Sequence, residues 1–439
     1  MIMIWVPPSL RAALLSLVAA LLVGCASDSN LPVAPNVLRD GSGSIQLKAL
    51  PPEQQKTSMQ IMYVTDRAVV PEETKGGNTT YGFGRSPHVS YGMTTVSFDK
   101  SVSWNELVRY SGSPSDRERY EMKVTGVREL GQFAPTLDRL TAKNGKLVIG
   151  DTEAEHNETL AAQETLTKLM ANYPQKDVYI FVHGFNNNFD DAVLRMAGIW
   201  HYLGRRGMPV VYTWPAGHGG LLGYFYDRES GEFTIYHLKR TLRIIAGCPS
   251  VERIHIIAHS RGTDVATTAL RELNEYYKGA GKDPQVELKL QTLALAAPDL
   301  DKDVFAQRFG SEGLANIAAQ VVIYGSEEDA AIAFARKLFG SSGRMGSFDP
   351  AKAPPQILAT LSQAPSIQFV RTKVTGFSTS HAYMFANPAA MSDLVLLLRD
   401  QKQAGAENGR PMEKHPGWWY LSNSYFDDKT KWVKEFHAD

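Results

Sequence analysis

The chain carries at residues 256–262 the stretch Ile256-Ile257-Ala258-His259-Ser260-Arg261-Gly262. A compact run rich in isoleucine, Arg253 to Ala258, precedes the serine and predicts a buried strand, and Thr263 to Tyr277 predicts a helix. The residues flanking the turn, Ala258 and Gly262, are small, and larger side chains would clash where the strand and helix backbones meet. The stretch therefore predicts a tight strand-to-helix turn that lifts the Ser260 hydroxyl to the edge of a sheet.

The alternation of strands and helices continues on both sides of this turn and decides the fold class. Short apolar runs predict strands at residues 59–67, 91–98, 147–149, 177–182, 210–214, 253–258, 290–297, 321–324 and 367–370. Helical patterns occur near Leu160 to Leu169 and at residues 192–203, 235–245, 263–277, 330–338 and 389–399. This order predicts an α/β fold with a mostly parallel central sheet and helices on both faces, in one domain over residues 57–400.

The first 25 residues are predicted to be a bacterial lipoprotein signal peptide. Arg11 precedes an apolar run of about a dozen residues, Ala12 to Val23, whereas a membrane-spanning helix needs ~20. The run ends in Leu22-Val23-Gly24-Cys25, which resembles a lipobox, so we expect Cys25 to carry the lipid anchor. An ordinary secretory signal with an incidental cysteine is the alternative.

The residues after the cysteine bear on the membrane that holds the protein. Ala26-Ser27 follows Cys25 with no aspartate directly after it, which resembles sorting to the outer membrane of the bacterial envelope. We expect the anchored domain to face the periplasm, although the sequence leaves the exterior face open. The membrane is thus a predicted partner through the N-terminal lipid.

Two other segments flank the predicted domain. Residues 26–56 are rich in Ser, Pro, Asn and Gly and are predicted to be a flexible tether. Residues 401–439 hold several aromatic side chains, among them Trp418 and Tyr425, and we expect this extension to pack on the domain; an interaction surface is the alternative. The chain has two cysteines, and with Cys25 used for the anchor no internal disulfide is expected.

Composition and histidine spacing argue against two classes of site. The chain has 46 basic and 46 acidic residues, and this balance gives no sign of the concentrated basic face that nucleic-acid binding requires. No pair of histidines has the spacing of a zinc protease. We therefore expect no nucleic-acid partner, no metal and no other cofactor.

The strand-to-helix turn at Ser260 is typical of a nucleophile elbow, with alanine in place of the first glycine. We expect Ser260 to be the nucleophile, with the backbone N–H of Arg261 at the helix N-terminus stabilising an oxyanion. His183-Gly184-Phe185 follows the predicted strand 177–182, and its Phe185 N–H would be the second donor. His183 and His259 are expected to be supporting residues.

An elbow of this kind needs an acid and then a histidine later in the chain. Asp299 follows the predicted strand 290–297, and Asp329 follows the next strand; hydrolases usually supply the acid from the second strand after the elbow, which favours Asp329. Asp299 stays the alternative acid, or caps a helix or shapes the pocket. His381, in a polar loop past the last strand, is the expected base; a surface histidine is the alternative.

The segment Gly217 to Phe233 combines glycines with apolar and aromatic side chains. It is interpreted as a lid or an acyl-binding wall, or alternatively as a packed loop.

Taken together, these motifs resemble a bacterial alpha/beta hydrolase group of largely unknown function, some of whose members are described as esterases or lipases. The resemblance covers roughly residues 59–399. It is carried by Val182-His183-Gly184-Phe185-Asn186, Tyr212-Thr213-Trp214-Pro215, Ile257-Ala258-His259-Ser260-Arg261-Gly262, Ala296-Ala297-Pro298-Asp299-Leu300-Asp301 and Ser380-His381.

The resemblance implies a serine hydrolase that acts on small-molecule or lipid carboxylic esters. Many relatives carry methionine where this chain has Arg261, and a cation beside the nucleophile would favour acidic or phosphate-bearing substrates. Two alternatives stay open from the residues alone. One is an envelope scaffold or binding protein in which the hydrolase fold is catalytically inactive. The other is an acyltransferase or amidase that uses the same triad.

Overall fold

The computed structural model describes residues 29–39, 42–73, 78–99, 101–113, 120–135, 140–149, 152–338, 340–373 and 381–426. The predicted signal peptide and Cys25 lie outside these residues. Within them, no helix combines the length and the apolar character needed to cross a bilayer.

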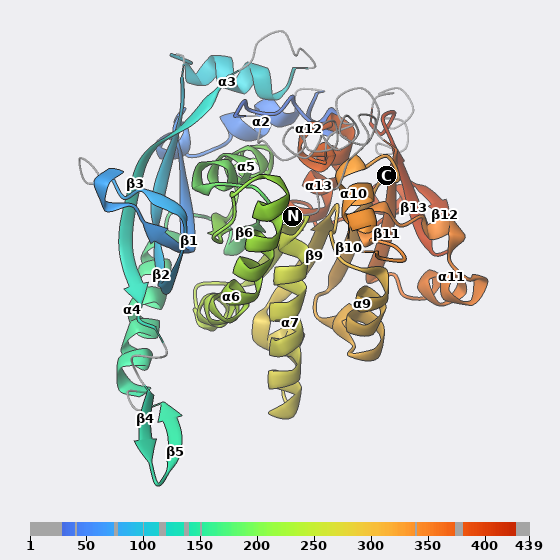
Figure 1. The fold of residues 1–439 in the computed structure, drawn as a ribbon. Coiled ribbons are helices and arrows are strands. Elements are labelled where there is room, and N and C mark those ends of the chain that lie inside the picture. Colours follow the sequence, from blue (N-terminus) through green and yellow to red (C-terminus); the bar gives the residue numbers. More distant parts are fainter. Residues whose placement is uncertain are drawn as a thin grey trace, which may run out of the picture.

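An 11-stranded sheet forms the centre of the molecule (Figure 1). In spatial order it contains β12 (Glu413–His415), β13 (Trp418–Ser422), β11 (Ile367–Lys373), β10 (Gln320–Gly325), β9 (Leu290–Ala296), β8 (Arg253–His259), β6 (Asp177–Val182), β7 (Met208–Thr213), β1 (Met59–Val69), β2 (Tyr81–Phe98) and β3 (Met122–Phe133). Neighbours from β13 to β1 pair in parallel, and the outer pairs β12–β13, β1–β2 and β2–β3 are antiparallel. The predicted α/β fold with a mostly parallel sheet is confirmed.

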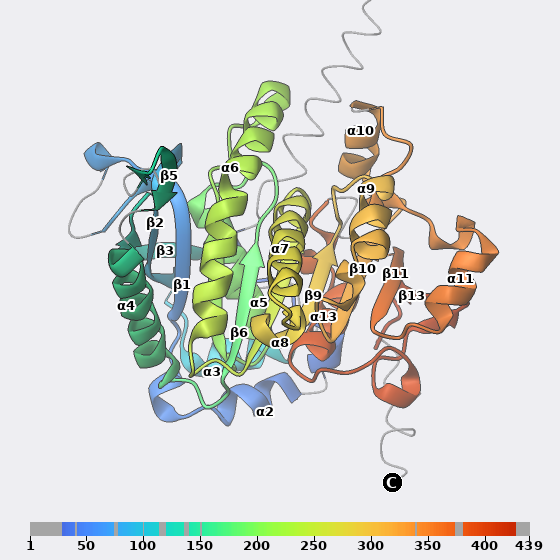
Figure 2. The same cartoon turned by 90° about the horizontal axis from the view of Figure 1, so that it is seen from below.

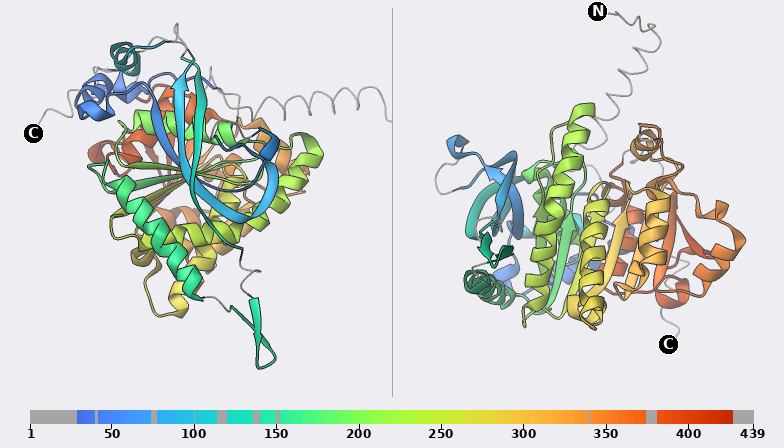
Figure 3. Two further views of the ribbon diagram at one scale, coloured as in Figure 1. Left: turned by 90° about the vertical axis from the view of Figure 1, so that its left-hand side faces the viewer. Right: turned by 60° about the horizontal axis from the view of Figure 1, so that its bottom comes forward.

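Helices cover both faces of this sheet. They are α2 (Ser42–Lys48), α3 (Trp104–Ser111), α4 (Thr152–Met170), α5 (Phe189–Tyr202), α6 (Gly220–Gly247), α7 (Gly262–Gly279), α8 (Pro284–Leu288), α9 (Lys302–Ala306), α10 (Ala330–Leu338), α11 (Pro355–Ser362), α12 (Tyr383–Ala386) and α13 (Pro388–Leu398). Helices α6 and α7 lie side by side on one face, and α5 and α13 lie on the other (Figures 2 and 3). The central strands β6, β7 and β10 are buried along their whole length, as expected for parallel strands covered on both sides.

Two elements differ from the sequence-based expectation. The predicted strand 147–149 belongs to a separate hairpin, β4 (Leu140–Lys143) with β5 (Lys146–Ile149), that projects from the domain (Figure 1). The structure also departs from the predicted tether within residues 29–56. Leu31 and Leu38 are buried in the core, and Asn36 Nδ2 donates to the carbonyl of Tyr425 at 2.8 Å. The composition of this segment is polar on average, but a few of its apolar side chains are buried and pack the segment against the domain.

The sheet fixes where the site lies. Because β6, β8, β9, β10 and β11 run in parallel, the residues that follow each of them meet at one edge. The residues predicted to carry the chemistry, Phe185, Ser260, Asp299, Asp329 and His381, come after these five strands in turn.

Candidate active site

Ser260 sits at the junction of β8 and α7 in a strained backbone conformation. Its φ is 53°, in the left-handed region that non-glycine residues rarely adopt, and such strain persists where the surrounding structure imposes it. The surroundings here are tight: a Cβ on Gly262 would lie 2.2 Å from the carbonyl oxygen of His183, and a Cβ on Gly184 would lie 2.7 Å from the Cβ of Ser260. The two glycines therefore let the elbow and the loop after β6 approach each other.

A buried histidine and carboxylate form the second part of the site. Nδ1 of His381 lies 2.7 Å from Oδ2 of Asp329, and both side chains are almost fully buried. Asp329 follows β10, and His381 comes just before α12. His381 lines the same small pocket as Ser260. The structure thus gives Ser260 a neighbouring histidine that is held by a carboxylate.

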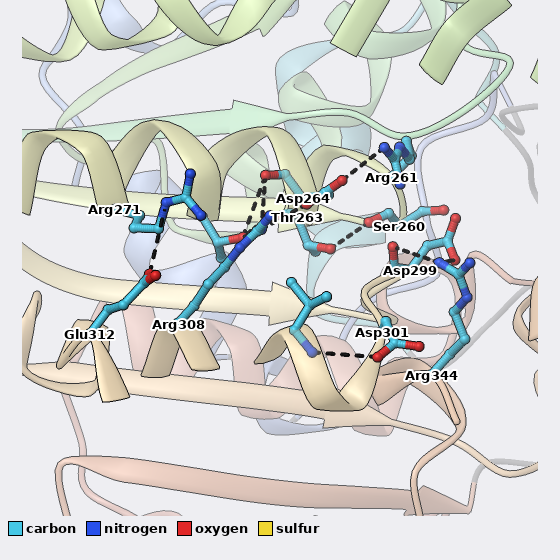
Figure 4. A network of polar contacts seen from close by, with 12 residues as sticks. Ser260, Arg261, Thr263, Asp264, Arg271, Asp299, Asp301, Arg308, Glu312 and Arg344 are labelled. Atoms are coloured by element: carbon cyan, nitrogen blue, oxygen red, sulfur yellow. Dashed lines mark hydrogen bonds and ion pairs between the residues drawn. The ribbon is translucent and has the colours of Figure 1, made fainter. Parts of the chain in front are cut away.

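Asp299, the alternative acid, has other partners. Its Oδ1 lies 2.7 Å from a guanidinium nitrogen of Arg344, and its Oδ2 accepts a hydrogen bond from the Tyr224 hydroxyl. Its backbone N–H donates to the carbonyl of Ser260 at 3.2 Å. Figure 4 shows Asp299 beside Ser260 and turned toward Arg344. In this arrangement the Asp299 side chain shapes the wall of the site, and it is Asp329 that holds the histidine.

The environment of His381 suits a base. Burial alone would lower its pKa, but the charge of Asp329, the hydrogen bond to it and the charge of Asp299 together raise the pKa above its ordinary value. His259, whose ring lies 4.8 Å from that of His381, bonds through Nε2 with the carbonyl of His381 at 3.1 Å. Burial and the nearby charge of His381 hold the pKa of His259 well below its ordinary value, so His259 is a neutral support.

His183 has a structural part in the loop after β6. Its Nδ1 donates to the Gly184 carbonyl at 2.9 Å, and its Nε2 accepts from the backbone N–H of Trp214 at 3.0 Å. Burial and the charge of Arg67 lower the pKa of His183 to about 3, which keeps the ring neutral. The ring stacks on Trp214 with centroids 5.1 Å apart. These contacts are those of a supporting residue.

Two further residues that the sequence interpretation did not single out hold this loop. Arg67, fully buried in β1, donates to the carbonyls of Asn187 and Ala216, each at 2.8 Å. Asp227 on α6 accepts from the backbone N–H of Asn186 at 3.0 Å. The sequence signal for Arg67 was a charged residue within the strand-like run 59–67, next to Asp66. For Asp227 the sequence offered no signal, because its partner is forty-one positions away. Together they place Phe185, whose N–H is the expected second oxyanion donor.

The predicted lid is the first half of a helix. Helix α6 begins at Gly220, after the N-cap Gly219 with φ 62°, so the glycines start the helix rather than form hinges. Tyr224 is buried with its ring 5.1 Å from that of Phe185, whereas Leu222 is 84% exposed. The segment is therefore largely helical rather than a packed loop, and Tyr224 on its inner face packs against the loop after β6.

Two cavities lie near Ser260. The smaller one, about 10 Å³, contains Ser260 and His381 and is walled by aromatic and polar side chains: Phe181, Phe185, Asn187, Arg195 and His259. The larger one has a volume of about 660 Å³. Ser260 does not line it, but the next residue, Arg261, and Asp299 do. Across the described ranges, no group of histidine, cysteine, aspartate and glutamate side chains has an arrangement that would hold a metal.

Comparison with protein families gives one result for this chain. A family model described as "Alpha/beta hydrolase of unknown function (DUF900)" matches residues 158–399. The matched range contains the elbow, Asp329 and His381, and it leaves out β1 to β3 and β13. Among curated proteins, no relative matches the chain.

Proposed function

Because this chain belongs to the family of alpha/beta hydrolases of unknown function, we propose that it is a serine hydrolase that cleaves carboxylic esters. One observation carries the proposal. The imidazole of His381, bound to Asp329 at 2.7 Å, shares a pocket with a serine held at φ 53° on a strand-to-helix turn. A nucleophile, a base and a group that orients the base are the parts that acyl transfer requires.

In the proposed reaction, Nε2 of His381 takes the proton of Ser260 as its Oγ attacks the ester carbonyl. The backbone N–H groups of Phe185 and Arg261 stabilise the negative charge that develops on the carbonyl oxygen. His381 then gives its proton to the leaving alcohol, which leaves an acyl group on Ser260. A water molecule, activated by the same histidine, attacks this acyl-enzyme and releases the acid. Asp329 fixes the tautomer of His381 and stabilises its charged form.

Labelling with a fluorophosphonate probe tests the nucleophile directly. Such a probe phosphonylates an activated serine, so we expect the wild-type chain to be labelled and the Ser260→Ala variant to be unlabelled. The comparison is read by in-gel fluorescence and by mass spectrometry of the modified peptide. Label retained in Ser260→Ala would place the activated serine elsewhere. A wild-type chain that takes no label, despite a native melting transition, would favour the inactive scaffold.

We also propose that the enzyme works at the bacterial envelope on a lipid anchor at Cys25, with its domain on the periplasmic side of the outer membrane. The support is the lipobox-like ending of the N-terminal apolar run. Cells fed a palmitate analogue are expected to label the wild type and to leave Cys25→Ser unlabelled. Label that survives in Cys25→Ser, or its absence from the wild type, would contradict the anchor.

A further inference from the structure

The larger cavity lies within reach of a substrate held at Ser260. Arg261, the next residue in the chain, lines it, and so does Asp299, whose backbone bonds to the Ser260 carbonyl. Tyr224 forms the wall toward the oxyanion loop, with its ring against Phe185 and its hydroxyl on Asp299. The cavity of about 660 Å³ has room for a small molecule, whereas the pocket around Ser260 holds about 10 Å³.

Three nearly buried arginines face this cavity. Arg261, Arg308 and Arg344 are each less than a tenth exposed, and they come from the start of α7, from the turn after α9 and from the segment after α10. Asp264 lies between two of them: its Oδ2 is 2.8 Å from Arg261 and its Oδ1 is 2.7 Å from Arg308 (Figure 4). The carboxylate of Asp264 thus forms ion pairs with both guanidinium groups.

Arg261 and Arg308 each have a nitrogen that makes no hydrogen bond within the described part of the chain. Nε of Arg261 and Nε of Arg308 are buried, and neither has a hydrogen-bond partner among the residues that the structure describes. A buried donor without an acceptor is unfavourable, and guanidinium donors match carboxylate and phosphate oxygens in geometry. Arg261 and Arg308 both line the cavity, and an anion bound there would be a further acceptor beside Asp264.

The other acidic residues of the cavity are already engaged. Asp301 caps α9, since its Oδ1 accepts from the N–H of Asp303 at 2.8 Å, and its Oδ2 accepts from the Ser341 hydroxyl. Oδ2 of Asp303 accepts from the Ser342 hydroxyl at 3.1 Å. Arg228 and Glu232 line the same cavity but are exposed to solvent. Carboxylates at the α9 end thus have donors from the protein, while at the α7 end Nε of Arg261 and Nε of Arg308 have no acceptor among the described residues.

From this asymmetry we infer that the cavity binds an anionic oxygen group, a carboxylate or a phosphate, on the alcohol part of the ester, through Arg261 and Arg308. The inference rests on the proposed ester hydrolysis. The alcohol part is assigned to this cavity because the pocket around Ser260, at about 10 Å³, holds no more than about one water molecule. The enzyme thus prefers esters of acidic alcohols to esters of neutral alcohols.

Matched aryl acetates test this preference on the full chain. The probes are 4-acetoxybenzoate, 4-acetoxyphenyl phosphate and the neutral methyl 4-acetoxybenzoate, which differ at one ring position in charge, size and electron withdrawal. We expect kcat/KM to be about tenfold or more higher for one or both anions than for the methyl ester, with the better anion identifying the natural group. Equal values for all three, or a preference for the neutral ester, would overturn the inference.

Variants of Arg308 test whether this residue is responsible for the preference for anionic esters. Arg308→Gln removes one cation but leaves Asp264 paired with Arg261, so the chain is expected to fold. Its preference for the anion should fall about tenfold, and Arg308→Lys should recover part of it. Arg271→Gln is the matched control, because Arg271, on α7 beside this network, pairs with Glu312 (Figure 4) but does not line the cavity. A preference that survives Arg308→Gln, or falls equally in Arg271→Gln, would contradict the site.

Binding measurements distinguish a failure of the anion site from a failure of the proposed ester hydrolysis. Ser260→Ala is titrated by calorimetry with 4-acetoxybenzoate, with 4-acetoxyphenyl phosphate and with methyl 4-acetoxybenzoate, and the titrations are repeated after adding Arg308→Gln. If no ester is hydrolysed but the anion binds through Arg308, the proposed reaction fails and the anion site stands. If the neutral ester is hydrolysed and Ser260→Ala binds neither anion better than the methyl ester, the reaction stands and the anion site fails.

Discussion

An Asp329→Asn variant is expected to lose about 10²- to 10⁴-fold in kcat on a neutral ester such as 4-nitrophenyl acetate, whereas Asp299→Asn loses about tenfold or less. Oδ2 of Asp329 lies 2.7 Å from Nδ1 of His381. A carboxylate there keeps the proton on Nδ1, leaves Nε2 free to accept the serine proton and stabilises the imidazolium that forms. An asparagine keeps the shape but removes the charge, and its amide N–H favours the wrong tautomer.

Asp299 serves as the matched control because it is a neighbouring carboxylate with different partners. Arg344 and Tyr224 bind its side chain, so its charge reaches His381 only through space. Steady-state kinetics of the purified variants gives the two ratios, and thermal melting followed by circular dichroism establishes that both variants are folded. Equal losses, or a larger loss in folded Asp299→Asn, would contradict the assignment of Asp329 as the orienting acid.

The pH profile gives a second readout of the same pair. The base must be neutral to act, and the pKa of His381 is raised above its ordinary value of 6.5, so kcat/KM should fall as the pH drops through a value above 6.5. Asp329→Asn removes both a negative charge and a hydrogen-bond acceptor, and this acid limb should move to lower pH. Asp299→Asn removes only a charge effect and should move the limb less, in the same direction. A limb that stays in place in Asp329→Asn would contradict the pairing.

The elbow was predictable from sequence because its determinants are local. A strand, a serine and two small flanking residues lie within seven positions, and the structure shows what the second small residue does: a Cβ on Gly262 would meet the His183 carbonyl at 2.2 Å. The choice between Asp299 and Asp329 was not local. Both follow neighbouring parallel strands, and what separates them is where the chain returns with His381 after β11. The strand order limits the paths by which the chain can bring His381 back to the site, but it does not determine which of the two carboxylates His381 meets.

Other features could not be predicted from the sequence because they depend on contacts between residues that are far apart along the chain. The glycines and apolar residues of the segment Gly217 to Phe233 suggested a lid, a wall or a packed loop, whereas the structure begins a helix at Gly220 and packs Tyr224 against Phe185. The segment before residue 57 looked like a tether because its composition is polar, yet burial of Leu31 and Leu38 docks it. In each case a few apolar contacts outweighed the average composition, and only the folded chain identifies those contacts.

The C-terminal extension is fixed by a buried ion pair, and replacing its arginine should be strongly destabilising. Arg410→Leu is expected to lower the free energy of unfolding by about 3–5 kcal/mol. Arg410 and Asp393 have fully buried side chains, and two nitrogens of the guanidinium bind the carboxylate at 2.9 and 2.7 Å. The hydroxyls of Tyr324 and Tyr425 also donate to Asp393, each at 2.7 Å. Without Arg410 the carboxylate stays buried with two neutral donors and no compensating cation.

Urea unfolding of the variants measures this loss, and a second change distinguishes an unpaired charge from a packing defect. If the unpaired charge is the cause, Arg410→Leu combined with Asp393→Leu should be less destabilised than the sum of the single variants. Lys168→Met, which breaks an exposed i,i+4 pair with Glu164, is the control and should change the free energy by less than about 0.5 kcal/mol. Strictly additive losses at positions 393 and 410 would show that volume, rather than charge, holds the extension. The Tyr324 hydroxyl, which bonds with both Asp393 and Arg410, belongs to β10, the strand that precedes the proposed acid Asp329.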